Sequence, residues 1–341
     1  MTRLPEPVTL VDEMLEAIED GLHTSLDLLD PESGSEMIEM ISYHLGWRES
    51  APAAGKGKRL RPLLSLLTCQ AAGGEWRACV PVASAVELIH NFTLIHDDIE
   101  DQSETRRGRT TVWKRWGVAQ AINTGDAVLI LAHLSCQRLR QTGISAGTVL
   151  EVHRALDEAC LRLTVGQYQD LAFETRPDVL EPVYLEMVEG KTAALIASGT
   201  QSAALVAGAS PPIVEAYREF GRHLGLSFQI QDDILGIWGA PEVTGKPAGD
   251  DLRSRKKSLP ILFGLHNSKE FASLWNDSAL GPDDIQDMTN ELERGGALDY
   301  ARQASEKHMD TALAALDSAR PLQPAADELH RLSINLLGRE R

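Results

Sequence analysis

The chain has few cysteines and lacks a long uncharged apolar run. Its four cysteines, Cys69, Cys79, Cys136 and Cys160, are scattered among apolar neighbours, and none belongs to a Cys-x-x-Cys pair. This pattern is typical of reduced core thiols and excludes a disulfide framework. The longest weakly polar stretch, residues 192–209, contains several hydroxyl side chains and two glycines. It therefore favours a buried helix over a membrane span.

Basic residues are also in the minority. Lysine and arginine total 33 against 50 aspartates and glutamates, which gives a formal net charge of −17 and a pI near 5.0. This balance argues against nucleic-acid binding and against docking on anionic membranes. Apolar residues make up 43% of the chain and charged residues 24%, which excludes dominant disorder. The N-terminal residues show no basic segment followed by an apolar one, and we expect a cytoplasmic protein without stable membrane insertion.

Strand signals are nearly absent, whereas helical periodicity runs along the whole chain. Apolar residues recur every three to four positions in the stretches 8–29, 60–72, 80–100, 118–140, 148–174, 182–207 and 212–238. Several of these are apolar around most of their circumference, which is typical of helices in the centre of a large bundle. The breaks between them are short. We therefore predict one all-α domain over 1–341, with a motif-bearing core at about 55–265 and shorter peripheral helices at 267–341.

The first informative segment is LIHDDIEDQSETRRG, residues 94–108. Asp97 and Asp101 are four residues apart, so their carboxylates share one face of a helix, and Asp98 lies beside them. Like charges in an otherwise apolar helix are unfavourable, and Mg²⁺, which prefers oxygen ligands, would relieve that repulsion. Arg106 and Arg107 follow, and arginine suits phosphate oxygens. The alternative is a solvated acidic helix end with a basic cap.

Basic residues gather in GKGKRLRPLL, residues 55–64. Lys56, Lys58, Arg59 and Arg61 stand at the start of a predicted helix, where acidic side chains are normally favoured. A bound anion would use both these cations and the N–H groups of the helix end; a basic surface loop is the alternative. Lys191, in an apolar segment, would also be costly to bury without an anion, although a lysine that reaches solvent explains it equally.

A second acidic segment, FQIQDDILG (228–236), repeats the chemistry of the first. Asp232 and Asp233 lie on an apolar helix, and the glycine-rich segment 243–260 carries Lys246, Asp251, Lys256 and Lys257. Two acidic helical segments, each paired with cations, predict a diphosphate held between helices by bridging Mg²⁺ ions.

Together these segments resemble the trans-isoprenyl diphosphate synthases, a family of all-α prenyltransferases. The resemblance covers roughly residues 55–265 and rests on five motifs in order: GKRLRP, a histidine seven residues before the first acidic motif, the RRG after it, Lys191–Thr192, and FQIQDD. It implies an isoprenoid synthase helical bundle around a central active-site cavity and a homodimer. It further implies about three Mg²⁺ ions, with isopentenyl diphosphate and an allylic diphosphate as substrates.

The resemblance also implies roles for individual residues. The isopentenyl diphosphate would be bound by Lys58, Arg61, His90 and Arg107. The metal ligands would be Asp97, Asp98, Asp101 and Asp232, of which Asp97, Asp101 and Asp232 would bind directly. The allylic diphosphate and the reacting centre would be contacted by Arg106, Lys191, Thr192, Gln229, Lys246 and Lys256. The catalytic set would be Asp97, Asp101, Asp232, Lys191, Thr192 and Gln229. His96 is expected to pack between helices instead.

One residue departs from the family pattern. The fifth position of the second acidic motif is Gly236, so one carboxylate of that helix face is missing, but Asp232 is kept and we expect activity to survive. Phe92 and Thr93 lie about one turn before Asp97, where the resemblance implies that a bulky group closes the tunnel for the growing chain. No two-residue insertion interrupts the first motif. The expected product is geranylgeranyl diphosphate, with farnesyl or longer diphosphates as alternatives.

The implied reaction begins when the allylic diphosphate ionises. The isopentenyl double bond then attacks the cation, and a proton leaves to the departing pyrophosphate. Two other classes stay open: a class I terpene cyclase and a catalytically silent partner subunit. A cyclase would leave Lys58, Arg61 and His90 without a role, and the chain has no N-D-x-x-S-x-x-E run. Only Gly236 favours the silent subunit.

Overall fold

The computed structural model describes residues 9–47, 57–240, 248–276 and 281–337. In these ranges the regular structure is helical apart from one short hairpin, so the predicted all-α fold class is confirmed. The chain divides into two compact units, Met1–Leu156 with Gly199–Ser210 and Asp157–Ser198 with Pro211–Arg341. The single domain over the whole chain stays a prediction.

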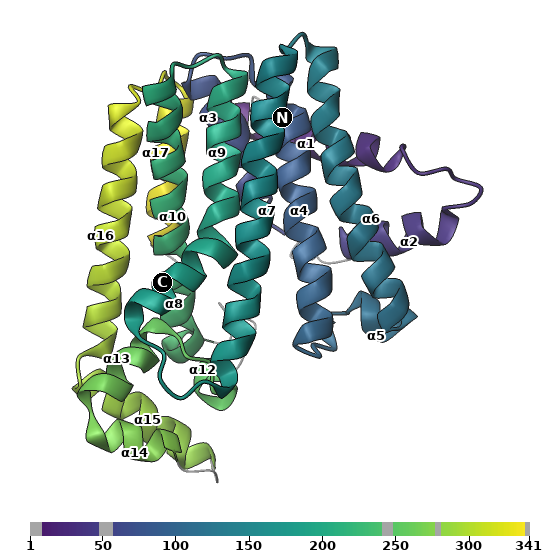
Figure 1. Cartoon of the computed structure of the whole chain (residues 1–341). Helices are drawn as coiled ribbons and strands as arrows, with labels where there is room; N and C mark the ends of the chain where they lie inside the picture. The colour runs from purple at the N-terminus through teal and green to yellow at the C-terminus, as the bar shows by residue number, and fades with distance from the viewer. Residues whose placement is uncertain (1–8, 48–56, 241–247, 277–280, 338–341) are drawn as a thin grey trace, which may run out of the picture. The chain divides into compact units, whose positions relative to one another are not determined.

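The first unit is organised around the helix that carries the first acidic motif. This helix, α4 (Val80–Glu100), lies alongside α6 (Val118–Gln137), and α1 (Leu10–Leu26) and α3 (Leu60–Ala71) pack against it (Figure 1). The unit also contains α2 (Ser35–His44), η2 (Trp76–Cys79), β1 (Thr105–Arg106), β2 (Arg109–Thr110), α5 (Val112–Trp116) and η3 (Arg138–Thr142). The helix α7 (Ala146–Thr175) begins in this unit, and α9 (Ala194–Val206) ends in it.

α4 is a core helix because most of its circumference is apolar. Pro81 stands in its first turn, where a missing backbone N–H is tolerated. Nearly all side chains from Pro81 to Ile89 are buried, and exposed polar groups begin only in the last turns. The stretch Trp76–Glu100 is long and apolar enough to cross a membrane, but 78% of its most apolar window is buried inside the protein. Such burial is expected of a core helix.

A tight hairpin follows α4. β1 pairs antiparallel with β2, and the two turn residues, Arg107 and Gly108, have φ angles of 51° and 73°. Two successive left-handed residues form a type I′ turn, whose twist matches that of a hairpin. Strands of two residues carry no apolar alternation, so the periodicity of the sequence does not reveal them.

The second unit is organised around α10 (Pro211–Trp238), which packs along α16 (Ala297–Ser318) (Figure 1). Its other elements are α8 (Glu181–Val188), the π-helix η4 (Glu189–Ala193), α12 (Asp250–Arg253), α13 (Leu259–Asn267), α14 (Lys269–Asn276), α15 (Pro282–Arg294) and α17 (Ala325–Leu337).

The segment after residue 267 departs from the expectation of shorter peripheral helices. α16 has 22 residues, and its buried face contains Ala301 and Ser305. The hydroxyl of Ser305 lies 3.0 Å from that of Ser227 on α10. Small side chains let two helices pack closely, and the polar residues that lower the hydropathy of this segment lie on the other face of α16. Average composition therefore concealed its place in the core.

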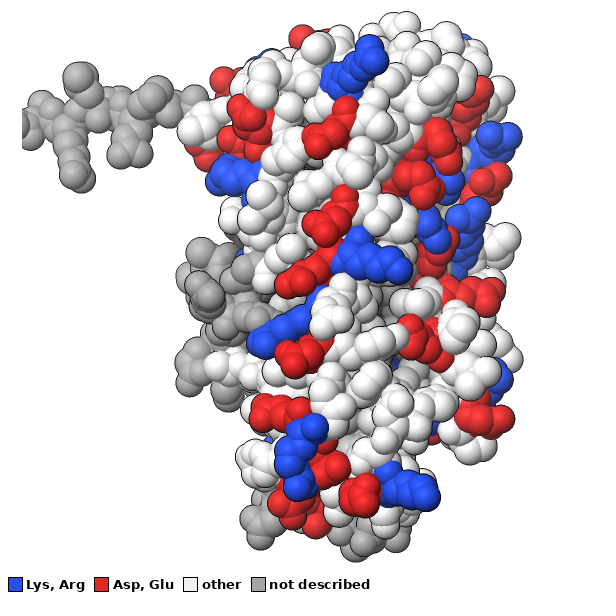
Figure 2. Space-filling model, turned by 90° about the vertical axis from the view of Figure 1, so that its left-hand side faces the viewer, with Lys and Arg blue, Asp and Glu red and all other residues white. Residues whose placement is uncertain are grey.

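Surface charges are mixed on the side of α16. Figure 2 shows acidic and basic side chains interspersed over this face rather than gathered by sign. A single-sign basic patch of the kind that binds nucleic acid is therefore not present on it.

Candidate active site

The first acidic motif lies at the end of α4. Asp101 is the residue that caps this helix, and its backbone N–H donates to the carbonyl of Asp97 at 2.8 Å. The two carboxylates are therefore one turn apart, as predicted. Asp97 is half-buried and Asp101 is exposed. At this spacing, two side chains can reach the same ion.

Asp98 has a different environment. It is 1% exposed, and its Oδ1 accepts a hydrogen bond from Arg106 Nε at 2.7 Å. Its Oδ2 is buried and accepts no hydrogen bond from the described residues. Burial raises the pKa of Asp98, the Arg106 charge opposes this, and the Asp101 charge raises the pKa further. The hairpin thus brings Arg106 against the acidic motif, and Asp98 fixes its guanidinium.

The basic segment divides into an internal and a surface part. Arg59 is 5% exposed, and its guanidinium forms ion pairs with Glu19 and Glu87, both at 2.7 Å. These pairs hold Arg59 in the protein interior. Lys58 is exposed and Arg61 is half-buried, so both can reach an anion at the surface.

The four residues expected to bind isopentenyl diphosphate all lie in the first unit; they are Lys58, Arg61, His90 and Arg107. Arg61 Nη1 is 3.4 Å from His90 Nε2, and the guanidinium of Arg107 lies against Gly57, the neighbour of Lys58 in the chain. Burial lowers the pKa of His90 well below its usual value, and the charges of Arg61 and Arg107 lower it further. The imidazole is therefore neutral at pH 7 and can share hydrogen bonds with a cation and an anion.

A small cavity of about 10 Å³ is enclosed beside this cluster, which is room for about one water molecule. Among the residues that line it are Tyr43, His44, Asp98, Arg106, Arg107 and Arg109. Arg109 donates to the carbonyls of Tyr43 and His44 at 2.6 and 3.2 Å. Because these carbonyls belong to the last turn of α2, the contacts tie the hairpin to α2. The sequence motifs did not point to any of these three residues.

The residues expected to limit product length lie on α4 before the acidic motif. Phe92 is half-buried, and its ring meets that of His96 edge-on, with centroids 5.1 Å apart. Thr93 is buried, and its hydroxyl donates to the carbonyl of His90 at 2.8 Å. His96 packs against Gly125 of α6, where a Cβ would lie 2.2 Å from Nε2. This contact agrees with the packing role expected for His96.

In the second unit, Lys191 and Thr192 lie on η4, and π-helical turns are often found at functional sites. Two glycines allow η4 to approach α7 closely. A Cβ on Gly166 would lie 2.3 Å from the backbone nitrogen of Lys191, and a Cβ on Gly190 would lie 2.7 Å from the carbonyl oxygen of Arg162. Any larger residue at either position would push the two helices apart.

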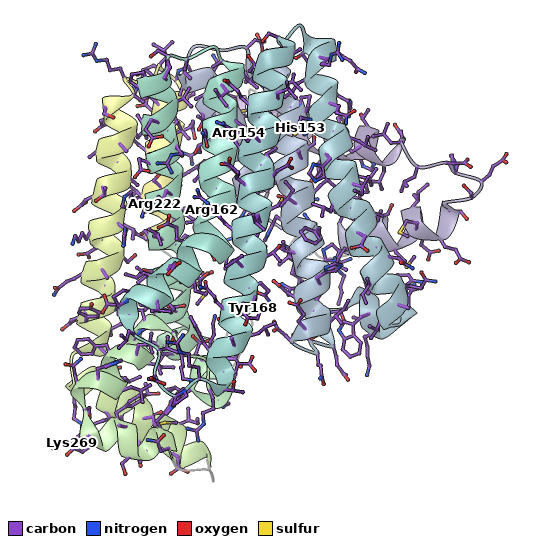
Figure 3. The ribbon with its side chains drawn as sticks, in the orientation of Figure 1. His153, Arg154, Arg162, Tyr168, Arg222 and Lys269 are labelled. Atoms are coloured by element: carbon purple, nitrogen blue, oxygen red, sulfur yellow. The ribbon has the colours of Figure 1, made fainter. Side chains whose placement is uncertain are left out.

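This approach gives Lys191 a partner on α7. Its Nζ donates to Asp170 Oδ2 at 2.5 Å, and both side chains are largely buried. Arg222 of α10, labelled in Figure 3, anchors the start of η4 through an ion pair with Glu189 at 2.6 Å. Within the protein, the anion that pairs with Lys191 is therefore Asp170, and the contact of Lys191 with a diphosphate stays a prediction.

A hydrogen-bond chain continues from Thr192 into α10. The Thr192 hydroxyl donates to Gln229 Oε1 at 2.8 Å, and Gln229 Nε2 donates to Asp233 Oδ1 at 3.1 Å. Asp233 Oδ2 accepts from the Tyr184 hydroxyl and from the backbone N–H of Leu259 at 3.0 Å. Asp233 is 1% exposed, and its pKa is raised by burial, which these donors oppose together with the charge of Lys256. It anchors α8, α10 and α13 to one point.

Asp232, the residue before this anchor, is half-buried. Lys256 lies nearby: burial alone would lower its pKa, but the charges of Asp251 and Asp233 outweigh that effect and raise it. Lys256 therefore stays positive beside the second acidic motif. Two cations named from the sequence, Lys56 and Lys246, lie outside the described residues.

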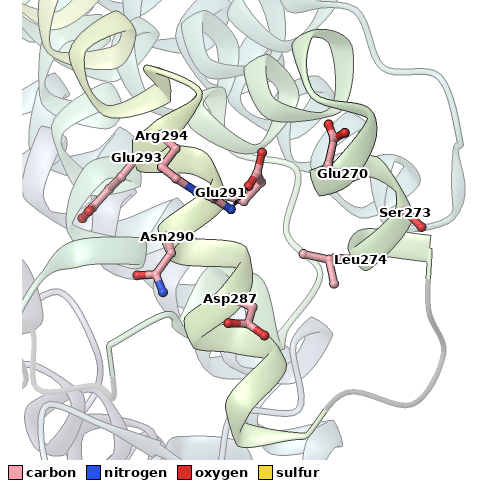
Figure 4. Close-up of a pocket in the computed structure, with 8 residues that line it drawn as sticks. All are labelled: Glu270, Ser273, Leu274, Asp287, Asn290, Glu291, Glu293 and Arg294. Atoms are coloured by element: carbon pink, nitrogen blue, oxygen red, sulfur yellow. Dashed lines mark hydrogen bonds and ion pairs between the residues drawn. The ribbon is translucent and has the colours of Figure 1, made fainter.

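Cavity size alone does not locate this chemistry. A surface cavity of about 860 Å³ lies between α14 and α15 (Figure 4), and its walls include Glu270, Leu274, Asp287 and Glu291. No residue singled out from the sequence lines it. The arrangement of charged groups on α4, the hairpin, η4 and α10 is the better guide.

The acidic residues fit a divalent cation that is shared with a diphosphate. Within the described residues, no group of three or more His, Cys, Asp or Glu side chains could hold a metal ion alone. Mg²⁺ characteristically binds one or two carboxylates and takes its other oxygens from phosphate and water. Asp97 and Asp101 provide such a pair, and the buried, unpaired Oδ2 of Asp98 adds negative charge beside them.

Comparison with known proteins identifies close relatives. The family model described as Polyprenyl synthetase matches residues 50–308. A (2E,6E)-farnesyl diphosphate synthase of Mycobacterium tuberculosis is 41% identical over 323 residues, or 91% of this chain and 86% of the relative. A geranylgeranyl diphosphate synthase of the same organism is 40% identical over 292 residues, or 83% and 82% of the two chains. The crystal structure of a geranylgeranyl pyrophosphate synthase from Corynebacterium glutamicum, complexed with isoprenyl diphosphate and magnesium, has a TM-score of 0.83 at 28% identity, and the match covers 97% of this chain and 100% of that one.

Proposed function

The chain belongs to the polyprenyl synthetase family, and we propose that it condenses an allylic diphosphate with isopentenyl diphosphate to form geranylgeranyl diphosphate. One observation carries the proposal. Each unit presents an acidic pair on a core helix, with one aspartate half-buried and the next one anchored in the protein, beside cations that suit diphosphate.

The allylic substrate would be held by its diphosphate. Arg106, Lys191 and Lys256 place positive charge where the leaving pyrophosphate becomes more negative as its C–O bond breaks. Lys191 pairs with Asp170 at 2.5 Å, and the diphosphate would replace Asp170 as its anion. Thr192 and Gln229 present oxygen atoms toward the allylic carbon, where positive charge develops.

Isopentenyl diphosphate would bind at the cluster in the first unit. Lys58, Arg61, His90 and Arg107 surround its diphosphate, and the neutral ring of His90 contributes a hydrogen bond without repelling the neighbouring cations. No protein base is evident at this cluster, so the proton released after the condensation would pass to the departing pyrophosphate. Exclusion of water protects the allylic cation from hydrolysis.

The carboxylates of Asp97, Asp101 and Asp232 would hold the metal ions, about three in number. When bound, Mg²⁺ would polarise the diphosphate oxygens as a Lewis acid and so improve the leaving group. The relative from Corynebacterium glutamicum, complexed with magnesium, supports this choice of ion.

The length of the product rests on Phe92. The relatives include a farnesyl and a geranylgeranyl diphosphate synthase of nearly equal identity, 41% and 40%, so similarity alone does not choose between them. Phe92 lies five residues before Asp97 and is packed against His96, which suits a floor one turn below the carboxylates. A twenty-carbon product is our proposal, and a fifteen-carbon product is the alternative.

The function is tested with the purified full chain, Mg²⁺, isopentenyl diphosphate and each of dimethylallyl, geranyl and farnesyl diphosphate, followed by chain-length analysis. We expect twenty-carbon product, loss of turnover on chelation of the metal, and a loss of at least about 100-fold for Asp97→Asn and for Asp232→Asn. Asp310→Asn, at an exposed position of α16, is the matched control. Wild-type turnover in either acidic-motif variant would contradict the proposal.

We also propose a homodimer, supported by apolar side chains exposed on neighbouring helices. Ile130 on α6 is 56% exposed and Leu150 on α7 is 71% exposed, and the rings of His133 and His153 stack between these helices. Farther along α7, Tyr168 is 72% exposed (Figure 3). Large apolar side chains that are exposed on adjacent helices suit an interface with a second copy of the chain.

Size-exclusion chromatography with light scattering, which measures the mass of the protein in solution, tests the proposed homodimer. The wild type is expected at twice the chain mass of 37.3 kDa, and a double Ile130→Glu, Leu150→Glu variant is expected at the chain mass. Asn123→Glu, on an exposed position of α6, should remain dimeric. A monomeric wild type would exclude this arrangement.

A further inference from the structure

The two acidic motifs differ at one position. In the first, Asp97 is followed by Asp101 one helical turn later; in the second, Asp232 is followed by Gly236 at the same spacing. The helix face that carries two carboxylates on α4 therefore carries one on α10. A glycine in the interior of a long helix also costs about 1 kcal/mol relative to alanine, so its presence on α10 needs a local reason.

The space that a side chain at position 236 would occupy is filled by Asp251. A Cβ built on Gly236 would lie 2.5 Å from the carboxyl carbon of Asp251 and 2.5 and 2.7 Å from its two oxygens. A carbon–carbon bond is about 1.5 Å, so in the rotamer that points toward Asp251 the carboxyl carbon of an aspartate at 236 would come to about 1 Å from that of Asp251, and the two groups claim the same space. No residue other than glycine can accommodate it there without movement.

The backbone holds Asp251 in this place. The N–H of Gly249 donates to the carbonyl of Ile237 at 3.0 Å, which ties the start of α12 to the end of α10. The N–H of Lys256 donates to the carbonyl of Asp251 at 3.0 Å. The Asp251 side chain is 9% exposed, so its carboxylate is directed at α10 and not at bulk solvent. Asp251 is also the strongest of the negative charges that keep Lys256 protonated.

We propose that Asp251 supplies the carboxylate that α10 lacks at position 236, and that Gly236 is present to admit it. Asp251 then acts as a positioning residue beside Asp232: it orients Lys256 and the water shell of a cation bound at Asp232. This inference rests on the proposed function of that site. It explains how the second motif keeps its acidic face although its own third carboxylate is missing.

The first test measures whether the two residues share space. Gly236→Ala should lower the thermal unfolding temperature of the full chain, and the same substitution in an Asp251→Ala background should lower it much less, because the obstructing carboxylate is gone. Equal effects of Gly236→Ala in both backgrounds would overturn the packing on which the proposal depends.

The second test measures the role of the carboxylate. Binding of inorganic pyrophosphate in the presence of Mg²⁺ is measured by calorimetry, without any turnover. Asp251→Asn should weaken binding about 10–100-fold, as is usual for the loss of a group that supports metal ligands. Asp250→Asn, its neighbour in the same turn of α12, should bind as the wild type does. Wild-type binding by Asp251→Asn would overturn the proposal.

The decisive variant moves the carboxylate back onto α10. Gly236→Asp combined with Asp251→Ala should recover at least about tenfold of the affinity lost by Asp251→Ala alone, and no recovery in a folded double variant would refute the equivalence of the two positions. Failure of the proposed function is a separate outcome: it would appear as a wild type that binds Mg²⁺ and pyrophosphate but forms no prenyl product.

Discussion

Asp233 gives the sharpest test of the network that supports the second acidic motif, because donors from α8, α10 and the start of α13 converge on its carboxylate. Asp233→Leu keeps the branched shape and the number of heavy atoms of the side chain and removes both acceptor oxygens. The Tyr184 hydroxyl, the Gln229 amide and the Leu259 N–H then lose their acceptor. Asp233→Asn keeps one oxygen and replaces the other with a donor.

The size of the effect follows from the donors left behind. A buried donor without an acceptor costs about 1–3 kcal/mol, and Tyr184 and Leu259 are both 1% exposed, whereas the half-buried Gln229 can turn to solvent. The two fully buried donors together should therefore lower the free energy of unfolding by about 2–6 kcal/mol. Burial of the Asp233 charge, which raises its pKa, is itself unfavourable, and the leucine variant removes that cost. This gain offsets part of the loss, so we expect the free energy of unfolding to fall by about 2–4 kcal/mol in total.

The asparagine variant should separate stability from activity. Gln229 can rotate its amide so that its carbonyl accepts from the new side-chain NH₂, and the Thr192 hydroxyl can then accept instead of donate. We expect a stability loss of about 1 kcal/mol but a larger fall in kcat/KM, because the Gln229 carbonyl no longer faces Thr192.

Urea unfolding and steady-state kinetics measure both effects, with Tyr184→Phe as a control that removes a single donor. A leucine variant within about 0.5 kcal/mol of the wild type would refute the reasoning, since the two buried donors, Tyr184 and Leu259, cannot lose their acceptor at so small a cost.

Two further predictions concern the first unit. Phe92→Ala should lengthen the product by at least one five-carbon unit, as measured by chromatography of the dephosphorylated prenols; unchanged length would remove Phe92 from that role. Burial, with the charges of Arg106 and Arg107, lowers the pKa of His44 to about 3 in the folded chain. Between pH 6.5 and about 3, His44 therefore binds a proton in the unfolded chain but not in the folded one, and the free energy of unfolding falls as the pH falls. The limiting slope is about 1.4 kcal/mol per pH unit. His44→Phe should therefore lose about 1 kcal/mol less than the wild type between pH 7.5 and 5.5 in urea unfolding, and an identical loss would show that His44 already titrates near its usual pKa.

The long helices could be predicted because burial imposes a period on the sequence. The stretch predicted at 80–100 coincides with α4, and the one predicted at 212–238 differs from α10 by a single residue. The stretch predicted at 182–207 contains an interruption that the periodicity could not show, the π-helix at Glu189–Ala193. One extra residue in a turn changes neither the composition nor the apolar pattern enough to be seen, and it depends on the contact with α7.

Among the site residues too, those that share one helix could be predicted from the sequence, and those that meet from distant parts of the chain could not. Motif spacing along one helix predicts which side chains share a face, and Asp97 and Asp101 confirm that geometry one turn apart. Partners that are distant in the chain carry no such signal. Asp170 lies 21 residues before Lys191, and Asp251 contacts the Gly236 position although the two residues belong to different helices. An acidic residue in a polar loop is too common in a chain with 50 acids to be singled out.

The structure also gives a physical reason for two adjacent aspartates in each motif. Successive residues on a helix point about 100° apart, so on a core helix one of a pair faces outward and the next faces the packed interior. Asp97 and Asp232 are half-buried, whereas Asp98 and Asp233 are each 1% exposed. The buried member is bound by the protein in both cases, by Arg106 in the first unit and by Tyr184, Gln229 and Leu259 in the second. A carboxylate that is already held by fixed donors cannot turn toward a ligand, but it can hold in place the cation or amide that does. The first aspartate of each pair is thus suited to a metal ion and the second to fixing the groups around it.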